Sequence, residues 1–221
     1  MRERQPGYYP RFKTLDQKKY WDTATRKVIE ERVANVPLIR YFAADELSLI
    51  TAICNRLIPQ EDRLPEFRIP IVNVIDERLR KNELAGQRYA DMPPDREAYA
   101  LGICAIDQTA REIFQRPFVD LTSLQQDRVL KSIHDGEKLA ADEIWQKMSI
   151  ERFWALLHGD CLTAYYSHPW AWDEIGFGGP AYPRGYMRLE NGQPEPWEKE
   201  EERYDWQPPV PTLSDQTEDN L

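Results

Sequence analysis

The segment that decides the fold reads ADEIWQKMSIERFWALLHGDCLTAYY over residues 141–166. Apolar side chains, among them Trp145, Phe153, Leu157 and Tyr165, occupy more than one face of the helix that this segment would form. A helix that is apolar on several faces is enclosed by its neighbours. We therefore predict one long central helix over residues 141–166, with shorter helices packed around it.

Shorter helices are predicted upstream, where apolar residues recur at spacings of three and four. Their expected positions are residues 23–34, 44–58, 70–81, 95–115 and a helix that begins after Thr122 or Ser123. No alternating apolar pattern of convincing strand length occurs. The expected fold is all-α: an irregular bundle of five or six helices around a central C-terminal helix, with a long irregular C-terminal extension rich in aromatic residues, Gly and Pro.

Charge is distributed unevenly along the 221 residues, whose formal net charge is −9. Residues 190–221 contain ten acidic and two basic side chains, so the remainder of the chain is close to neutral. A near-neutral body lacks the basic surface that nucleic acids require. We divide the chain into an extended arm (1–14), a helical domain (15–189) and an acidic, Pro-containing tail (190–221).

The sequence contains neither a secretory signal peptide nor a membrane-spanning segment, the two features that would place the protein outside the cytoplasm or in a membrane. The N-terminus has no apolar stretch typical of a signal peptide, and no run of about 18 apolar residues predicts a membrane span. We expect a cytoplasmic protein, which would be periplasmic only if a partner that carries a signal exported it.

The three cysteines do not predict a zinc ribbon, because no CxxC pair is present. Cys54 and Cys104 lie among apolar residues of predicted helices, so we expect both to be buried free thiols. For Cys161, pairing with a cysteine of a partner is left open.

Catalytic patterns are weak throughout the chain. His158, Asp160 and His168 could in principle converge on a metal ion, although no HExxH motif or His/Cys cluster is present. Gly176-Phe177-Gly178-Gly179 lacks the spacing of a phosphate-binding loop, and no GxSxG motif occurs. A stand-alone, metal-dependent helical enzyme therefore remains an alternative to a binding protein.

Residues 165–189, YYSHPWAWDEIGFGGPAYPRGYMRL, show neither a helix nor a strand period and predict an irregular path. Trp and Tyr are common anchors of protein interfaces. We expect a partner-binding surface here and in the tail, with the alternative that the rings cover this chain's own helices. The residues expected at this interface are Tyr166, His168, Trp170, Trp172, Ile175, Phe177, Gly178, Gly179, Tyr182, Tyr186, Trp197 and Trp206.

Three motifs, in order and at matching spacing, resemble the gluconate 2-dehydrogenase subunit 3 family. The first is FAADEL (42–47) followed by CNRLIPQ (54–60), the second ALGICAID (100–107), and the third WDEIGFGG (172–179). The resemblance covers about residues 40–180. The chain lacks the twin-arginine signal that exported members carry, and it adds the arm and the acidic tail.

The resemblance implies a non-catalytic small subunit that binds and stabilises a large FAD-dependent dehydrogenase of the glucose–methanol–choline type. That partner would hold the FAD and oxidise a sugar, glycoside or polyol, and would pass electrons to a cytochrome subunit or another acceptor. The resemblance assigns no catalytic, cofactor-binding or metal-binding residue to this chain. A transient adaptor that assembles a flavoenzyme is the remaining alternative.

Overall fold

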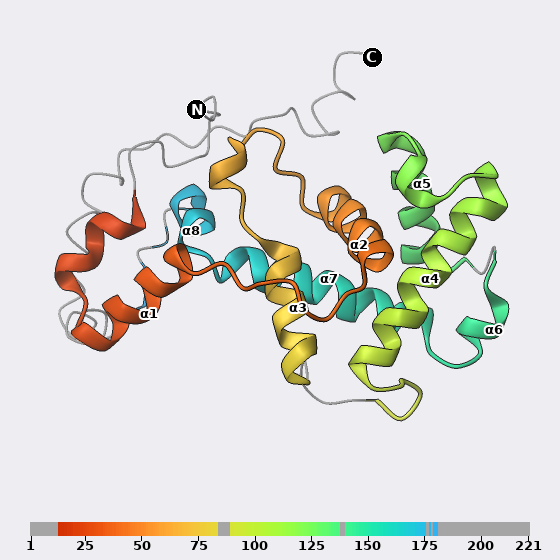
Figure 1. Ribbon diagram of the computed structural model, residues 1–221, viewed down its shortest axis with the longest axis horizontal. Coiled ribbons are helices and arrows are strands. Elements are labelled where there is room, and N and C mark those ends of the chain that lie inside the picture. Colours follow the sequence, from red (N-terminus) through yellow and green to blue (C-terminus); the bar gives the residue numbers. More distant parts are fainter. Residues whose placement is uncertain (1–12, 84–88, 138–139, 176, 178, 181–221) are drawn as a thin grey trace, which may run out of the picture. The chain divides into compact units, whose positions relative to one another are not determined.

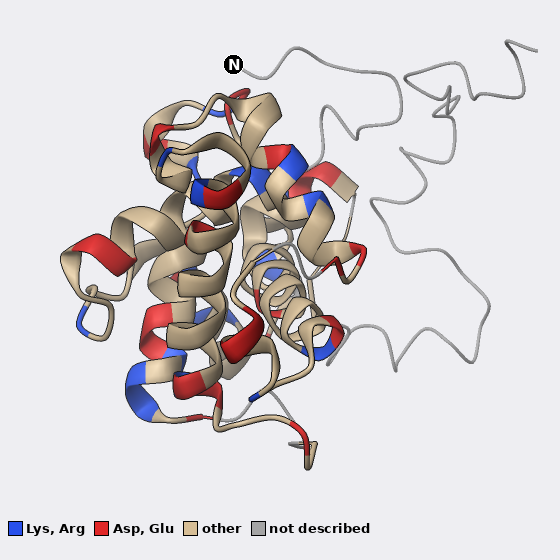
Figure 2. Ribbon diagram, turned by 90° about the vertical axis from the view of Figure 1, so that its right-hand side faces the viewer, with Lys and Arg blue, Asp and Glu red and all other residues tan. Residues whose placement is uncertain are grey.

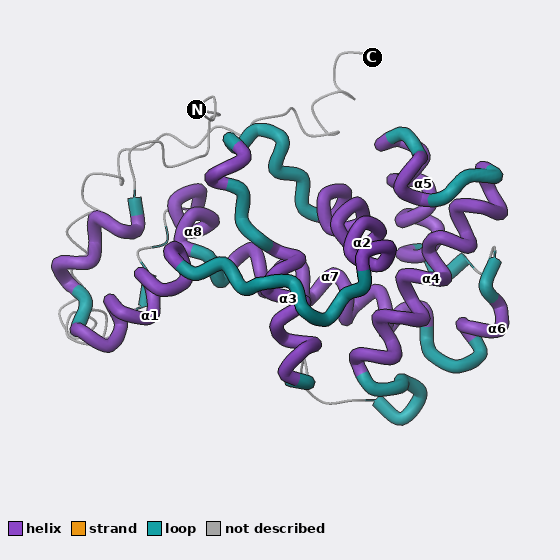
Figure 3. The backbone as a smooth tube through the Cα atoms, in the orientation of Figure 1, coloured by secondary structure: helices purple, strands orange, loops and turns teal. Residues whose placement is uncertain are grey.

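The computed structural model describes residues 13–83, 89–137, 140–175, 177, 179 and 180 (Figure 1). All regular structure within these residues is helical (Figure 3), which confirms the predicted all-α fold. Contacts divide the chain into two compact units. We call the described residues of 36–61 and 68–167 the major unit, and the described residues of 13–35, 62–67 and 168–180 the minor unit.

The major unit is built around its last helix, as the sequence predicts. Its elements are α2 (Ala44–Leu57), α3 (Ile71–Lys81), α4 (Asp95–Phe114), η3 (Phe118–Asp120), α5 (Ser123–His134), α6 (Asp142–Trp145) and α7 (Ile150–Tyr166). Helix α7 packs against α2, α3, α4 and α5. Phe153 and Leu157 on α7 are fully buried, so this helix forms the centre of the unit's core.

The predicted single helix over residues 141–166 is wrong in one respect, because it is broken between α6 and α7. Ser149 precedes α7, and its side chain accepts a hydrogen bond from the backbone N–H of Arg152 at 3.2 Å. A serine hydroxyl at this position satisfies an N–H group at the start of a helix. The break leaves Trp145 and Met148 both buried. The other predicted helices end within two residues of the observed bounds.

Two buried carboxylates tie the helices of the major unit together. Asp76 on α3 accepts hydrogen bonds from the backbone N–H groups of Arg40, Tyr41 and Phe42 at 2.8–3.0 Å. Asp160 on α7 accepts hydrogen bonds from Arg78 at 2.5 Å and from Tyr99 at 2.6 Å. Burial raises the pKa of Asp160, whereas the hydrogen bonds from Tyr99 and Arg78 act to lower it. These contacts compensate the cost of burying polar groups.

The minor unit contains η1 (Thr14–Tyr20), α1 (Thr23–Ala34), η2 (Pro65–Phe67) and α8 (Pro169–Ile175). Trp21, Ile29 and Trp172 form its buried cluster, and Leu15 packs against them. The sequence prediction of an irregular path is wrong for residues 169–175, because Pro169 begins a helical turn there. Proline is well suited to the first position of a helix, where its missing N–H leaves no bond unmade.

Charged residues of both signs intermingle along the described helices (Figure 2), in agreement with the near-neutral body seen in the sequence. Within the described ranges, no helix is long and apolar enough to cross a membrane. The predicted arm and acidic tail lie outside the described residues, except for Lys13 and Thr14.

Candidate functional site

Helix α8 exposes little charge because both of its carboxylates are engaged within the minor unit. Asp173 accepts a hydrogen bond from the backbone N–H of Thr14 at 2.7 Å. Glu174 forms an ion pair with Arg63, and both side chains are nearly covered. Arg63 also donates to the carbonyl oxygen of Trp170 at 3.1 Å. Burial raises the pKa of Asp173, and its hydrogen bonds with Thr14 act in the opposite direction.

His168 precedes α8 and acts as its cap. The backbone N–H of Trp170 donates to His168 Nδ1 at 3.2 Å, and the ring also bonds the backbone of Arg32. Burial lowers the pKa of His168 to about 4, and the positive charge of Arg63 acts in the same direction. The ring is therefore neutral at pH 7 and holds the start of α8 in place.

Several large apolar side chains on α8, just after it and in the 62–67 segment that contacts it are exposed. Exposed fractions are 46% for Leu64, 49% for Phe67, 52% for Ile175 and 46% for Phe177. Half-buried Trp170 packs edge-to-face on Phe67, with ring centroids 5.5 Å apart. We call these five residues the α8 surface. Clusters of exposed apolar side chains mark interaction sites on soluble proteins.

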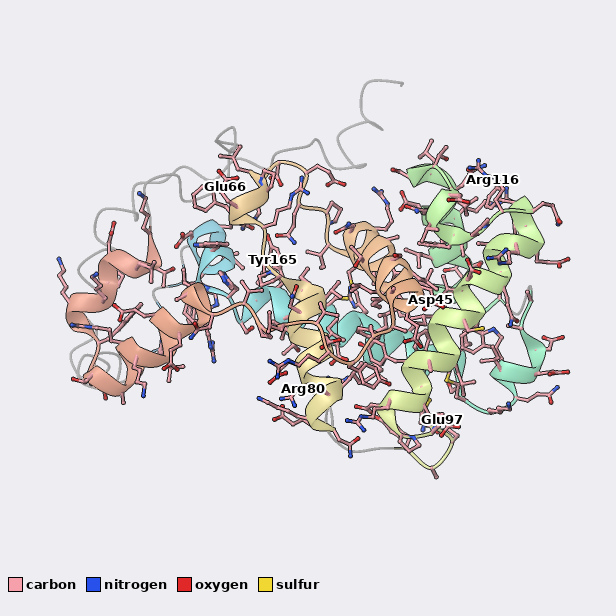
Figure 4. All side chains as sticks on the ribbon, viewed as in Figure 1. Asp45, Glu66, Arg80, Glu97, Arg116 and Tyr165 are labelled. Atoms are coloured by element: carbon pink, nitrogen blue, oxygen red, sulfur yellow. The ribbon has the colours of Figure 1, made fainter. Side chains whose placement is uncertain are left out.

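A charged side chain lies among the residues of the α8 surface. Glu66 lies between Leu64 and Phe67 in η2, and its side chain is exposed (Figure 4). Phe177 rests edge-to-face on buried Trp172, with centroids 5.3 Å apart. The surface thus has a fixed aromatic base, which reduces the side-chain entropy that would be lost when a partner binds.

The predicted interface residues fall into three groups. Tyr166, Ile175 and Phe177 are exposed, and Trp170 is partly exposed. His168, Trp172 and Gly179 are buried within this chain, as the alternative interpretation expects for Trp172. Gly178, Tyr182, Tyr186, Trp197 and Trp206 lie outside the described residues. The interface itself stays a prediction.

The residues predicted for the interface do not include Leu64, Phe67 or Arg63, because most of the residues around them are polar or proline and form no apolar period. Two large apolar residues in a polar loop, at positions 64 and 67, were the available signal. In the structure, Gln60 hydrogen-bonds both backbone groups of Ile69 at 2.8 and 3.1 Å, which closes the base of this loop. The loop is thus held at its ends.

The residues considered for a metal site do not form one. Asp160 is bonded to Arg78 and Tyr99, and the ring of His158 stacks on Trp154 with centroids 6.1 Å apart. Across the described ranges, no group of three His, Cys, Asp or Glu residues is arranged to hold a metal ion.

The major unit contains a groove of about 610 Å³ between α2, α4 and η3. Asp45 at the start of α2 (Figure 4) lies along it, with Leu49, Ile103 and Val119 as apolar lining. Cys104 also lines this groove and is exposed, so the prediction that it is a buried thiol was wrong. The helix turns this position outward, although its sequence neighbours are apolar.

Comparison with protein families gives a match over residues 44–179, more than half of the chain, to the family described as gluconate 2-dehydrogenase subunit 3. This range takes in all of the described major unit from α2 onward, as well as α8. No curated protein and no solved structure matches the chain.

Proposed function

This chain belongs to the gluconate 2-dehydrogenase subunit 3 family, and we propose that it is the non-catalytic accessory subunit of an FAD-dependent dehydrogenase that oxidises a sugar, glycoside or polyol. The observation that carries the proposal is the family match over residues 44–179. In this proposal the large subunit, of the glucose–methanol–choline type, holds the FAD and performs hydride transfer. This chain binds and stabilises that subunit.

The α8 surface is the proposed contact with the large subunit. It combines exposed aromatic and aliphatic side chains with two carboxylates that are bonded within the chain, Glu174 to Arg63 and Asp173 to the backbone N–H of Thr14. Binding there would remove apolar area from water at about 25 cal/mol per Å². Aromatic residues at the centre of such an interface supply most of its binding energy.

Co-purification from the native host tests the proposal. The chain carries an affinity tag, and the captured material is examined for a stoichiometric large subunit and for a flavin absorbance spectrum. We expect a yellow complex that reduces an artificial dye when gluconate or a related sugar or polyol is added. The tagged chain purified alone should neither bind flavin nor reduce the dye.

Three outcomes would contradict the proposal in different ways. Substrate-dependent dye reduction by the chain alone would make it an enzyme. A flavoprotein that is captured but separates on size-exclusion chromatography would indicate a transient assembly adaptor. Absence of any flavoprotein in the captured material would remove the accessory role altogether.

A further inference from the structure

Two of the three cysteines meet in the core of the major unit. Cys54 on α2 and Cys161 on α7 are 2% and 0% exposed, and their Sγ atoms are 3.6 Å apart. The residues are 107 positions apart in the sequence, so folding alone brings them together. Buried Cys161 is therefore placed to meet Cys54 and not a cysteine of another protein.

The surroundings of the pair disfavour thiol chemistry once the chain has folded. The hydrogen bond with Cys161 and burial together raise the pKa of Cys54 well above its ordinary value. The thiolate is the reactive form in thiol–disulfide exchange, so Cys54 in the folded chain is a poor nucleophile. Oxidation of this pair is accordingly confined to the period in which α2 and α7 come together, before both thiols are covered.

We propose that Cys54 and Cys161 are an oxidation site that forms an intramolecular disulfide when the chain folds in the presence of a disulfide donor, such as oxidised glutathione or a dithiol–disulfide oxidoreductase. The proposal is independent of the accessory role. The sulfurs are already in contact, and they need to approach only to the bonding distance of about 2.05 Å.

The reaction proceeds in two exchanges. One cysteine thiolate attacks a sulfur of the donor disulfide, which gives a mixed disulfide and releases one donor thiolate. The second cysteine thiolate then attacks the protein sulfur of the mixed disulfide and releases the second donor thiolate. The protein pair loses two electrons to the donor, and the two protons of the cysteine thiols pass through solvent to the two donor thiolates.

The cross-link would close a loop that includes most of the major unit. It would restrict the unfolded chain far more than the folded one, in which α2 and α7 are already packed. We expect the oxidised protein to melt on the order of 10 °C above the reduced protein. Burial would also protect the bond from reductants until the chain unfolds.

Thiol counting on the full chain tests the proposal. The protein is expressed in parallel in cells with a reducing cytoplasm and in cells that lack cytoplasmic disulfide reductases. Each sample is denatured, alkylated with a maleimide and weighed by mass spectrometry. We expect three alkylated cysteines in the reduced sample and one, Cys104, in the oxidised sample, with peptide mapping that joins the Cys54 and Cys161 peptides.

Cys104 provides a matched control because it is exposed on the same unit. A Cys104→Ser variant should count two thiols when reduced and none when oxidised, and it should keep the redox-dependent melting shift. Cys54→Ser should abolish the redox-dependent melting shift. If this variant folds poorly, the thiol counts of the wild type and of Cys104→Ser still test the proposal. Three free thiols in the oxidised wild type, or a disulfide that includes Cys104, would overturn the proposal.

Discussion

The major unit has a large helical core, whereas the described part of the minor unit has a small buried cluster and exposes large apolar residues on and beside α8. In the major unit, Asp76 and Asp160 are buried with several donors each, and α7 is packed by four other helices. The minor unit's described part has a small buried cluster, Trp21, Ile29 and Trp172, beside the exposed side chains of the α8 surface. The difference indicates that the major unit supplies most of the buried core, and that the minor unit presents the α8 surface.

The largest expected effect comes from removing the carboxylate at the centre of the major unit. Asp160→Ala would remove this partner from the hydroxyl of buried Tyr99 and from the mostly covered guanidinium of Arg78, which keeps its ion pair with Asp95. Loss of one member of a buried ion pair costs about 3–5 kcal/mol. Urea unfolding should show this loss, and exposed Glu112→Ala on α4 should change stability by less than about 0.5 kcal/mol. A cost below about 1 kcal/mol for Asp160→Ala would mean that the core does not depend on this cluster.

Close packing between α4 and α7 gives the next effect. A Cβ added at Gly102 would lie 2.1 Å from the ring of Phe153, which is fully buried. Overpacking of this kind costs about 1–3 kcal/mol, so Gly102→Ala should lower the melting temperature. Gly159→Ala on α7 is the matched control, since no atom lies within 4 Å of its added Cβ. The control should be neutral or stabilising by up to about 1 kcal/mol, and an equal loss in both variants would contradict the packing argument.

Acidification should act on the minor unit through His168. Its pKa is lowered from 6.5 to about 4 in the folded chain by burial and by Arg63, so protonation favours the unfolded state. The neutral ring's contribution to stability is complete above pH 6.5 and is lost as the pH falls from 6.5 to 4. His168→Asn keeps an acceptor for the cap but does not titrate.

Urea unfolding of both proteins at a series of pH values measures this effect. Between pH 7 and pH 4, the wild type should lose on the order of 2 kcal/mol more than His168→Asn. Parallel pH profiles for the two proteins would show that the ring is not buried in its neutral form.

The sequence predicted most of the major unit because helical periodicity and caps are local signals. Thr122 caps α5 where predicted, and Pro59 lies just beyond the end of α2. The break at Ser149 was missed, since a serine cap inside an apolar run is a weaker signal than the run itself. The turn of α8 was missed because its seven residues are too few to establish a period.

The candidate site was only partly predictable. The aromatic residues of 165–189 indicated the region in which α8 lies. The sequence could not tell that Trp172 is buried and Phe177 exposed, because the burial of Trp172 depends on its packing with Trp21 and Ile29 from another part of the chain. Leu64 and Phe67 reach the same unit from a loop more than 100 residues earlier in the sequence. Contacts of that kind arise from the fold and have no local pattern.

The smallest expected effect on stability belongs to the α8 surface itself. Ile175→Asp replaces a side chain that is half exposed, so the isolated chain should change its free energy of unfolding by less than about 0.5 kcal/mol. Its solubility should rise, since an exposed apolar patch becomes smaller. A loss of several kcal/mol in urea unfolding would show that Ile175 belongs to the core and not to a binding surface.

Affinity for the large flavoprotein subunit tests the central claim most directly. The wild type, an Ile175→Asp/Phe177→Asp double variant and a Leu124→Asp control are titrated against the purified large subunit. Leu124, 82% exposed on α5 of the major unit, is an apolar position outside the α8 surface. The account predicts that the double variant binds at least about tenfold more weakly, a loss of about 1.4 kcal/mol, while the control stays within about twofold. Equal affinity of the double variant and the wild type would contradict it.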